Sequence, residues 1–214
     1  MARALAWHAR GRGFEPHLLH QSTSDEVLFY FYIYGMKKIL AFTGSNHSKS
    51  INRQLMRFAL ELVDKNRFEI EEIDLQDFEP IMLSIDEQRE NGIPKETNAL
   101  YERMQEYDGF IIASPEHNGS TPAFLKNITD WLSRKDLKFF DGKPLLLLST
   151  SNGKNGGKTN IRFLEDSYKR FSANVSGTYS LPEFKINFQD GKISDGQETE
   201  KLKESIAAFE ELFH

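Results

Sequence analysis

The sequence predicts an α/β domain built as a doubly wound parallel sheet with helices on both faces. From residue 38 onward, short apolar runs alternate with segments whose apolar residues recur at helical spacing. Three of these runs lead directly into loops rich in glycine, serine and other polar residues: the first loop (residues 44–52), the second loop (115–120) and the third loop (150–157). Loops that leave the carboxyl ends of parallel strands meet at one edge of the sheet, where ligands bind.

Five strands are predicted from short apolar or alternating runs, at residues 38–43, 68–73, 109–114, 145–149 and 174–180. The second alternates as a half-exposed edge strand, whereas the third is apolar on both faces, as a central parallel strand should be. Five helices are predicted from one-sided apolar spacing, at residues 51–62, 98–107, 121–132, 157–171 and 197–213. Pro122 suits the first turn of the third helix, where its missing N–H costs nothing. The strand order expected for this alternation is the flavodoxin-like order 2-1-3-4-5.

Two segments depart from the alternation of strands and helices. Residues 74–97 are polar and are interrupted by Pro80, Gly92 and Pro94, which predicts a long loop. Residues 184–193 predict an irregular segment or a hairpin, because Asp190 is followed by a glycine at the centre of the segment.

Residues 1–35 differ from the rest of the chain, and we exclude them from the predicted domain, which spans 36–214. They combine a basic stretch with a late, short aromatic run that lacks the small-residue cleavage pattern of a secretory signal. Residues 13–16, Gly-Phe-Glu-Pro, match the self-complementary codons GGG-TTC-GAA-CCC, which resemble the T arm of a transfer RNA gene. We therefore expect a non-domain extension, with Met36 as the natural start.

Composition narrows the classes of function. The 214 residues are 39% hydrophobic and 28% charged, which suits one domain with a sizeable core. The net charge of -5, with acids and bases mixed along the chain, predicts no nucleic-acid partner, and no apolar run reaches the roughly 18 residues that a membrane span needs. The absence of cysteine excludes disulfides and thiol catalysis and is compatible with a reducing cytoplasm. No histidine spacing predicts a metal site.

The first loop joins a strand to a helix, which is the arrangement that points backbone N–H groups and the helix dipole at an anion. Ser45, Ser50 and Asn52 add hydroxyl and amide groups, and His47 adds one ring donor when neutral or two when protonated. Helix capping by a serine is the plainer interpretation of any one of these residues. The density of donors favours a phosphate site.

The second loop begins with a stiff turn at Pro115. It then offers polar groups and a close backbone approach to a ring edge from Glu116, His117, Asn118 and Gly119. Because such residues are also common in ordinary turns between strand and helix, this loop taken alone fits either interpretation.

The third loop runs into a sequence close to the nucleotide-binding pattern G-x-x-x-x-G-K-[ST], at residues 152–159. The register fails because Asn152 stands where the first glycine is required, and no acidic magnesium partner is evident. A nucleoside triphosphatase is therefore the less favoured interpretation. We expect instead a flexible wall that lets a planar ring lie against backbone.

Together with Thr121-Pro122, Leu125-Lys126-Asn127 and Asp130-Trp131, the three loops resemble the NAD(P)H-dependent FMN reductase family, a flavodoxin-like group that includes quinone, chromate and azo-dye reductases. The resemblance runs from about Met36 to the C-terminus in matching order. It implies bound FMN, NADPH or NADH as co-substrate, and a homodimer or homotetramer with the flavin near a subunit interface. The expected subunit contacts are the Asp130-Trp131 region and residues 74–97.

The resemblance assigns cofactor-binding residues position by position. Those expected around the FMN phosphate are Ser45, His47, Ser50, Ile51 and Asn52. Those expected along the ribityl chain and the ring edge are Pro115, Glu116, His117, Asn118 and Gly119. Those expected to close the far side are Ser151, Gly153 and Gly156. Arginine is usual in the family where His47 stands, and tyrosine where His117 stands. An imidazole in place of a permanent cation weakens phosphate binding and makes it pH-sensitive.

The function that the resemblance implies is an FMN-dependent NAD(P)H oxidoreductase. Hydride passes from nicotinamide to FMN, and the electrons pass on to a quinone, a flavin, an azo compound or a metal oxyanion. Because the flavin carries this chemistry, we expect no catalytic protein residue. Two alternatives remain open: a flavodoxin-like electron carrier without nicotinamide-dependent turnover, and a flavin-binding or flavin-free scaffold. A strongly acidic surface would suit a carrier, and the 27 basic residues weigh against one.

Overall fold

The computed structural model describes residues 35–213, so the extension predicted for the N-terminus falls almost wholly outside the described residues. Five parallel strands form one sheet in the order β2-β1-β3-β4-β5, which confirms the predicted fold class and strand order. The strands are β1 (Lys37–Thr43), β2 (Phe68–Ile73), β3 (Gly109–Ala113), β4 (Pro144–Thr150) and β5 (Asn174–Leu181).

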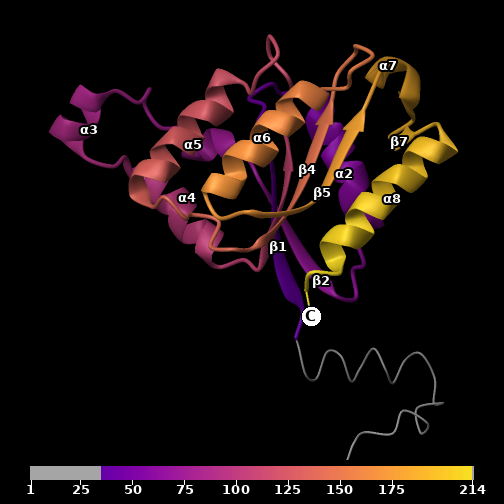
Figure 1. Ribbon diagram of the computed structural model, residues 1–214, viewed down its shortest axis with the longest axis horizontal. Coiled ribbons are helices and arrows are strands. Elements are labelled where there is room, and N and C mark those ends of the chain that lie inside the picture. The colour runs from indigo at the N-terminus through magenta and orange to yellow at the C-terminus, as the bar shows by residue number, and fades with distance from the viewer. Residues whose placement is uncertain (1–34, 214) are drawn as a thin grey trace, which may run out of the picture. The chain divides into compact units, whose positions relative to one another are not determined.

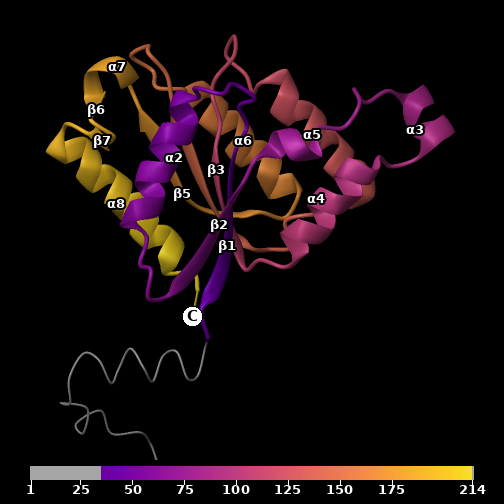
Figure 2. The same ribbon diagram turned by 180° about the vertical axis from the view of Figure 1, so that it is seen from behind.

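Helices cover both faces of the sheet. The helices α2 (Ile51–Leu62) and α8 (Gly196–Glu210) pack on one face, and α4 (Lys95–Gln105), α5 (Ala123–Lys135) and α6 (Lys158–Arg170) pack on the other. The helix α6 lies in front of the sheet in Figure 1, and α2 lies in front of it in Figure 2.

The central strands bury side chains on both faces. In β1, Ile39 and Ala41 belong to the core beneath α2 and α8, whereas Leu40 and Phe42 belong to the core beneath α4, α5 and α6. All four are less than 5% exposed. Successive side chains of a strand point to opposite faces, so a strand covered on both faces must be apolar at every position. This explains why the apolar runs predicted the central strands well.

The prediction of a long loop at residues 74–97 is wrong in part. It contains a 3-10 helix, η2 (Leu75–Phe78), the helix α3 (Ile85–Asn91) and the first residues of α4. Ser84 caps α3 by accepting a hydrogen bond from the backbone N–H of Glu87. Gly92, with φ +76°, ends the helix. No residue of α3 is buried, so the segment lacks the apolar spacing from which a helix is predicted, and it projects from the domain in Figure 1.

The segment predicted as an irregular or hairpin excursion forms α7 (Phe184–Asn187) followed by a short antiparallel pair, β6 (Phe188–Gln189) and β7 (Lys192–Ile193). Asp190 and Gly191 make the turn between them with φ values of 51° and 79°. Positive φ at both central residues is what a two-residue hairpin turn requires. The hairpin alternative is therefore confirmed.

Trp131, which was expected at a subunit contact, is buried inside the protomer. Its indole Nε1 donates to the backbone oxygen of Ile81 at 2.7 Å, and its side chain is 0% exposed. Asn127 holds the same segment by donating to the backbone oxygens of Pro80 and Ile81 and by accepting from Leu83 N. These residues of α5 anchor the segment that leads to α3.

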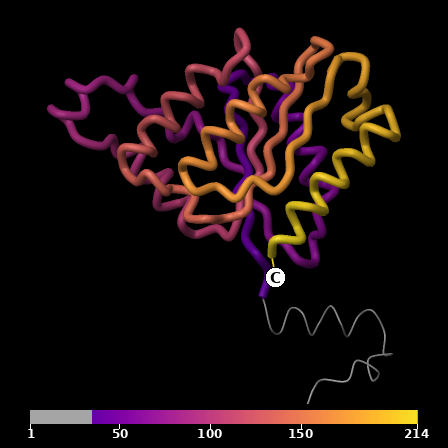
Figure 3. The backbone as a smooth tube through the Cα atoms, viewed as in Figure 1, coloured from indigo at the N-terminus to yellow at the C-terminus, as the bar shows by residue number. Residues whose placement is uncertain are grey.

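The three polar loops leave the carboxyl ends of β1, β3 and β4 and lie at the same end of the sheet (Figure 3). The sheet thus brings together segments that are far apart in the sequence.

Candidate functional site

A cavity of about 320 Å³ opens at this end of the sheet, between the three loops. Nine of the predicted site residues line it: Ser45, His47, Ser50, Ile51, Asn52, Pro115, Glu116, His117 and Ser151. The lining also contains three residues that were not among the predicted site residues, Lys49, Thr150 and Asn152. Four predicted residues do not line it: Asn118, Gly119, Gly153 and Gly156.

The first loop presents hydrogen-bond donors at the start of α2. Ser50 caps the helix, because its hydroxyl oxygen accepts from the backbone N–H of Arg53 at 3.3 Å. The backbone N–H groups of Ile51 and Asn52 have no hydrogen-bond partner among the described residues. They lie at the positive end of the helix dipole, and Ser45 lines the same cavity, so this part of the cavity fits an anion.

The imidazole of His47 is oriented by its own loop. Its Nδ1 accepts from the backbone N–H of Lys49 at 3.1 Å, so Nε2 is the ring nitrogen left for a ligand.

Lys49 adds a basic side chain to the residues that line the cavity. Lys49 has no ion-pair partner within the described part of the chain. The position of a lysine between two serines of the first loop is the signal that could have identified it from the sequence.

The Asn52 side chain is used within the protein. It donates through Nδ2 to the backbone oxygen of Thr150 at 3.1 Å, and its Oδ1 accepts from the backbone N–H of Thr150 at 2.9 Å. Asn52 is 1% exposed. Its side chain therefore clamps the start of α2 to the end of β4, and its backbone N–H remains available to a ligand.

The second loop folds back on itself and is attached to α6. His117 and Ser120 exchange backbone hydrogen bonds of 2.8 and 3.0 Å, and the turn between them consists of Asn118 and Gly119 with φ values of 52° and 76°. This turn holds two of the predicted residues away from the cavity lining. The Glu116 carboxylate accepts from the backbone N–H of Asn160 at 3.2 Å, so it caps the first turn of α6.

Glycines let the third loop pack against the strands. A Cβ at Gly156 would lie 2.7 Å from the backbone of Leu181, and a Cβ at Gly157 would lie 2.0 Å from the Ser149 hydroxyl oxygen. Gly156 thus shapes the loop without lining the cavity. Lys158, the lysine of the near-match to a nucleotide-binding loop, lines a separate groove of about 490 Å³ beside β5. It lies outside the lining of the three-loop cavity, which argues further against a nucleoside triphosphatase.

Membrane spans and metal sites are two other classes of feature to consider in the described residues. No helix among them is long and apolar enough to cross a membrane. No group of three or more histidine, aspartate or glutamate side chains among them is placed to hold a metal ion.

Comparisons with known proteins agree with this geometry. Residues 37–185 match the family model described as NADPH-dependent FMN reductase. A quinone reductase of Escherichia coli K12 is 34% identical over 134 residues, which cover 59% of this chain and 70% of the relative. An NADPH:quinone oxidoreductase of Arabidopsis thaliana is 29% identical over 190 residues, which cover 81% of this chain and 90% of the relative.

Solved structures share the fold. The flavoenzyme NAD(P)H:(acceptor) oxidoreductase FerB from Paracoccus denitrificans superposes with a TM-score of 0.62 at 24% identity, over 81% of this chain and 95% of that chain. A second structure, titled as the apo form of an NADH:FMN oxidoreductase, has a TM-score of 0.64 at 19% identity, over 84% of this chain and 91% of that chain.

Proposed function

Because this chain belongs to the NADPH-dependent FMN reductase family, we propose that the cavity between its three loops binds FMN and that the protein uses NAD(P)H to reduce a small-molecule acceptor of the quinone or flavin type. The observation that carries the proposal is the set of unpaired backbone donors at the start of α2. Ser45, Lys49, Ser50, Ile51 and Asn52 all line one cavity, and the N–H groups of Ile51 and Asn52 have no hydrogen-bond partner among the described residues. This donor set fits a phosphate group.

The other two loops fit the rest of the cofactor. Pro115 and Glu116 provide one wall of the cavity, and Thr150 and Ser151 provide backbone along another. A planar ring placed between these walls would meet apolar surface and backbone polar groups. When bound, FMN supplies the redox chemistry, in which a hydride from the nicotinamide is accepted and two electrons leave to the acceptor. The chain's own residues bind and orient the cofactor, and no protein residue is assigned a catalytic role.

The colour of the purified protein and its turnover test this proposal together. The visible spectrum of the protein should show a bound flavin, and acid release followed by chromatography should identify it as FMN. Oxidation of NADPH or NADH should then depend on an added quinone or flavin. Bound flavin without nicotinamide oxidation would point to an electron carrier, and release of FAD would contradict the phosphate site.

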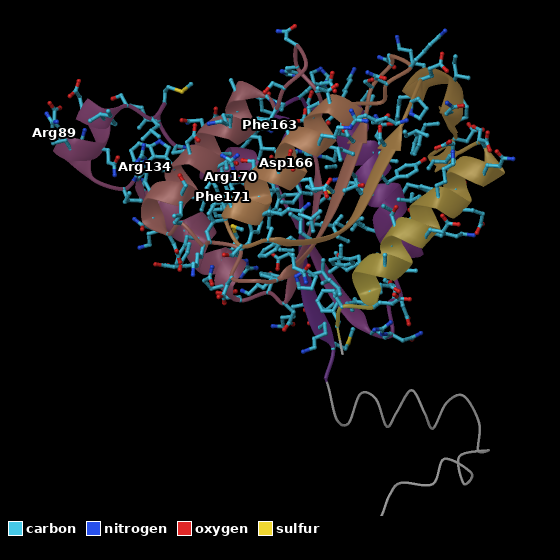
Figure 4. The ribbon with its side chains drawn as sticks, in the orientation of Figure 1. Arg89, Arg134, Phe163, Asp166, Arg170 and Phe171 are labelled. Atoms are coloured by element: carbon cyan, nitrogen blue, oxygen red, sulfur yellow. The ribbon has the colours of Figure 1, made fainter. Side chains whose placement is uncertain are left out.

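The assembly that we propose is a homodimer or a homotetramer. Apolar side chains are exposed around the projecting segment and α6: Ile81 is 58%, Met82 66%, Ile85 72% and Phe163 38% exposed. Figure 4 places Phe163, Asp166 and Arg170 along α6 and Arg134 on the neighbouring α5. Contiguous exposed apolar patches, unlike single exposed side chains, mark protein–protein contacts.

Unpaired charges on the same helices support a second copy as the occupant. Arg134, Asp166 and Arg170 form no ion pair within the described residues, so the surface offers both signs of charge to an identical partner. Light scattering should give at least twice the 24.7 kDa of one chain, and Phe163→Asp should lower that mass. A protein that is monomeric and fully active would contradict the proposal.

We also propose the cytoplasm as the compartment of this protein, which the absence of cysteine supports.

A further inference from the structure

Asn160 lies in the first turn of α6 and forms hydrogen bonds with three consecutive residues at the beginning of the second loop. Its Nδ2 donates to the Ser114 hydroxyl oxygen and to the Pro115 backbone oxygen, both at 2.9 Å. Its backbone N–H donates to the Glu116 carboxylate at 3.2 Å. The side chain is 0% exposed and does not line the cavity.

The wall formed by Pro115 and Glu116 depends on this residue. Ser114 is fixed independently, because its N–H donates to Leu148 O and its carbonyl accepts from the Ser149 hydroxyl at 2.7 Å. His117 is bonded to Ser120 within the turn of the loop itself. Among the described residues, Asn160 supplies every hydrogen bond that joins Pro115 and Glu116 to another element of the fold.

The same residue couples the second loop to the third. Asn160 follows the third loop by three residues, and its helix begins close to the strands because Gly157 has no side chain to meet the Ser149 hydroxyl. The position of the third loop therefore sets the position of the Asn160 amide. Because Pro115 and Glu116 line the cavity while Asn160 does not, any effect of Asn160 on a ligand is transmitted through them.

We propose that Asn160 is a positioning residue that holds the Pro115–Glu116 wall in the conformation that receives the flavin ring. The proposal rests on the proposed function of the cavity. Removal of the Asn160 side chain takes away no contact with the cofactor. It makes the Pro115–Glu116 wall more mobile, so the wall must become ordered when FMN binds. Such ordering lowers affinity, and we expect the Kd for FMN to rise about tenfold.

Three variants and a matched control test this role. Asn160→Ala removes both side-chain donors, Asn160→Asp keeps the volume but directs an oxygen at the Pro115 carbonyl, and Asn160→Ser retains one donor. Asn98→Ala is the control, because Asn98 also lies in the first turns of a helix and its Nδ2 donates to the backbone oxygens of Ile93 and Pro94, away from the cavity.

Three quantities are measured on each variant: the hydrogen exchange of the His117, Ser120 and Asn160 amides in flavin-free protein, the Kd for FMN, and the Tm. The proposal expects faster exchange of these amides and a higher Kd in Asn160→Ala and Asn160→Asp, with partial recovery in Asn160→Ser. The control should show a change in Tm at most. Unchanged loop exchange or an unchanged Kd in folded Asn160→Ala would overturn the proposal.

FMN binding by the wild-type protein separates this inference from the function on which it rests. If the wild-type protein binds no FMN, the proposed function fails, and the role of Asn160 toward the cofactor fails with it. If the wild type binds FMN and Asn160→Ala binds it equally well, the positioning role alone is contradicted. If Asn160→Ala does not fold, the same comparison is made with Asn160→Ser.

Discussion

Asn52, in the first turn of α2, and Thr150, the last residue of β4, exchange two hydrogen bonds although they lie 98 residues apart in the sequence. The pair joins the first loop to the third, and Asn160 joins the third to the second. Two buried asparagines in the first turns of helices thus fix the relative positions of all three loops. The cavity is shaped by groups that the ligand itself need not touch.

Asn52→Asp should destabilise the protein. The substitution replaces the donor to the Thr150 carbonyl with an oxygen in a buried position, so one hydrogen bond is lost and two acceptors face each other. We expect the free energy of unfolding to fall by about 1–3 kcal/mol. Urea denaturation measures it, and a midpoint equal to that of the wild type would show that the pair does not stabilise the fold.

Gly157→Ala should be more destabilising than the same substitution at a glycine whose added Cβ would contact no other atom. Gly157 has φ +86°, and its added Cβ would lie 2.0 Å from the Ser149 hydroxyl oxygen. Gly142→Ala is the matched control, because Gly142 has φ +75° and no heavy atom within 4 Å of the added Cβ.

Both glycine variants bear backbone strain of about 1 kcal/mol or more, and Gly157→Ala bears the clash in addition. Thermal unfolding should therefore rank Gly157→Ala below Gly142→Ala. Adding Ser149→Ala to Gly157→Ala should recover part of the loss. Equal Tm values for the two single variants would argue against close packing of α6 on β4.

Lys49→Gln should weaken FMN binding. Lys49 lines the cavity and forms no ion pair with any residue that the structure describes, and a charge-assisted contact to phosphate contributes roughly 1.5–3 kcal/mol before solvent screening. Because the side chain is exposed, we expect a several-fold rise in Kd that shrinks as salt is added. Lys154→Gln is the control, since Lys154 belongs to the third loop but does not line the cavity. If both variants bind FMN with the same Kd, Lys49 does not belong to the phosphate site.

Glu71 should make stability depend on pH in the acid range. The Arg103 guanidinium and the Tyr107 hydroxyl donate to its carboxylate and hold the pKa of Glu71 below its ordinary value. The unfolded chain therefore takes up the Glu71 proton more readily than the folded chain does. The stability from Glu71 is complete above the ordinary carboxyl pKa and is lost as the pH falls through the lowered one.

The side chain of Glu71 is 40% exposed, so after screening the effect should be below about 1 kcal/mol. Glu71→Gln should flatten the acid side of the plot of Tm against pH. If the wild type and this variant lose stability in parallel as the pH falls, Glu71 does not contribute to the dependence.

Local sequence predicted the elements that bury apolar surface and missed those that do not. The strand β3 is apolar throughout because both faces are covered, and it was found within one residue. The helix α3 has no buried residue and was missed, although Ser84 followed by Glu87 three residues later is a capping pattern that could have located it. The position of the cavity was predicted from the three polar loops, because loops that follow parallel strands lie at the same end of the sheet.

The residues that tie the loops together could not be recognised locally. Asn52 was assigned to the phosphate from its place in the first loop, but its side chain is paired with the backbone of Thr150. Asn160 follows the third loop, in the first turn of a helix. In the sequence it cannot be told apart from any other polar residue at such a position. Which backbone groups these side chains meet is decided by tertiary packing, which a local pattern does not contain.

The most direct test of the account compares the binding of FMN and riboflavin to flavin-free protein by fluorescence titration. The two ligands share the ring and the ribityl chain and differ in the phosphate, for which we propose the start of α2 as the binding site. A Kd for riboflavin at least about tenfold higher than that for FMN is predicted, since charge-assisted hydrogen bonds to the phosphate would be absent. Equal affinities for the two flavins would contradict the assignment of the first loop as a phosphate site.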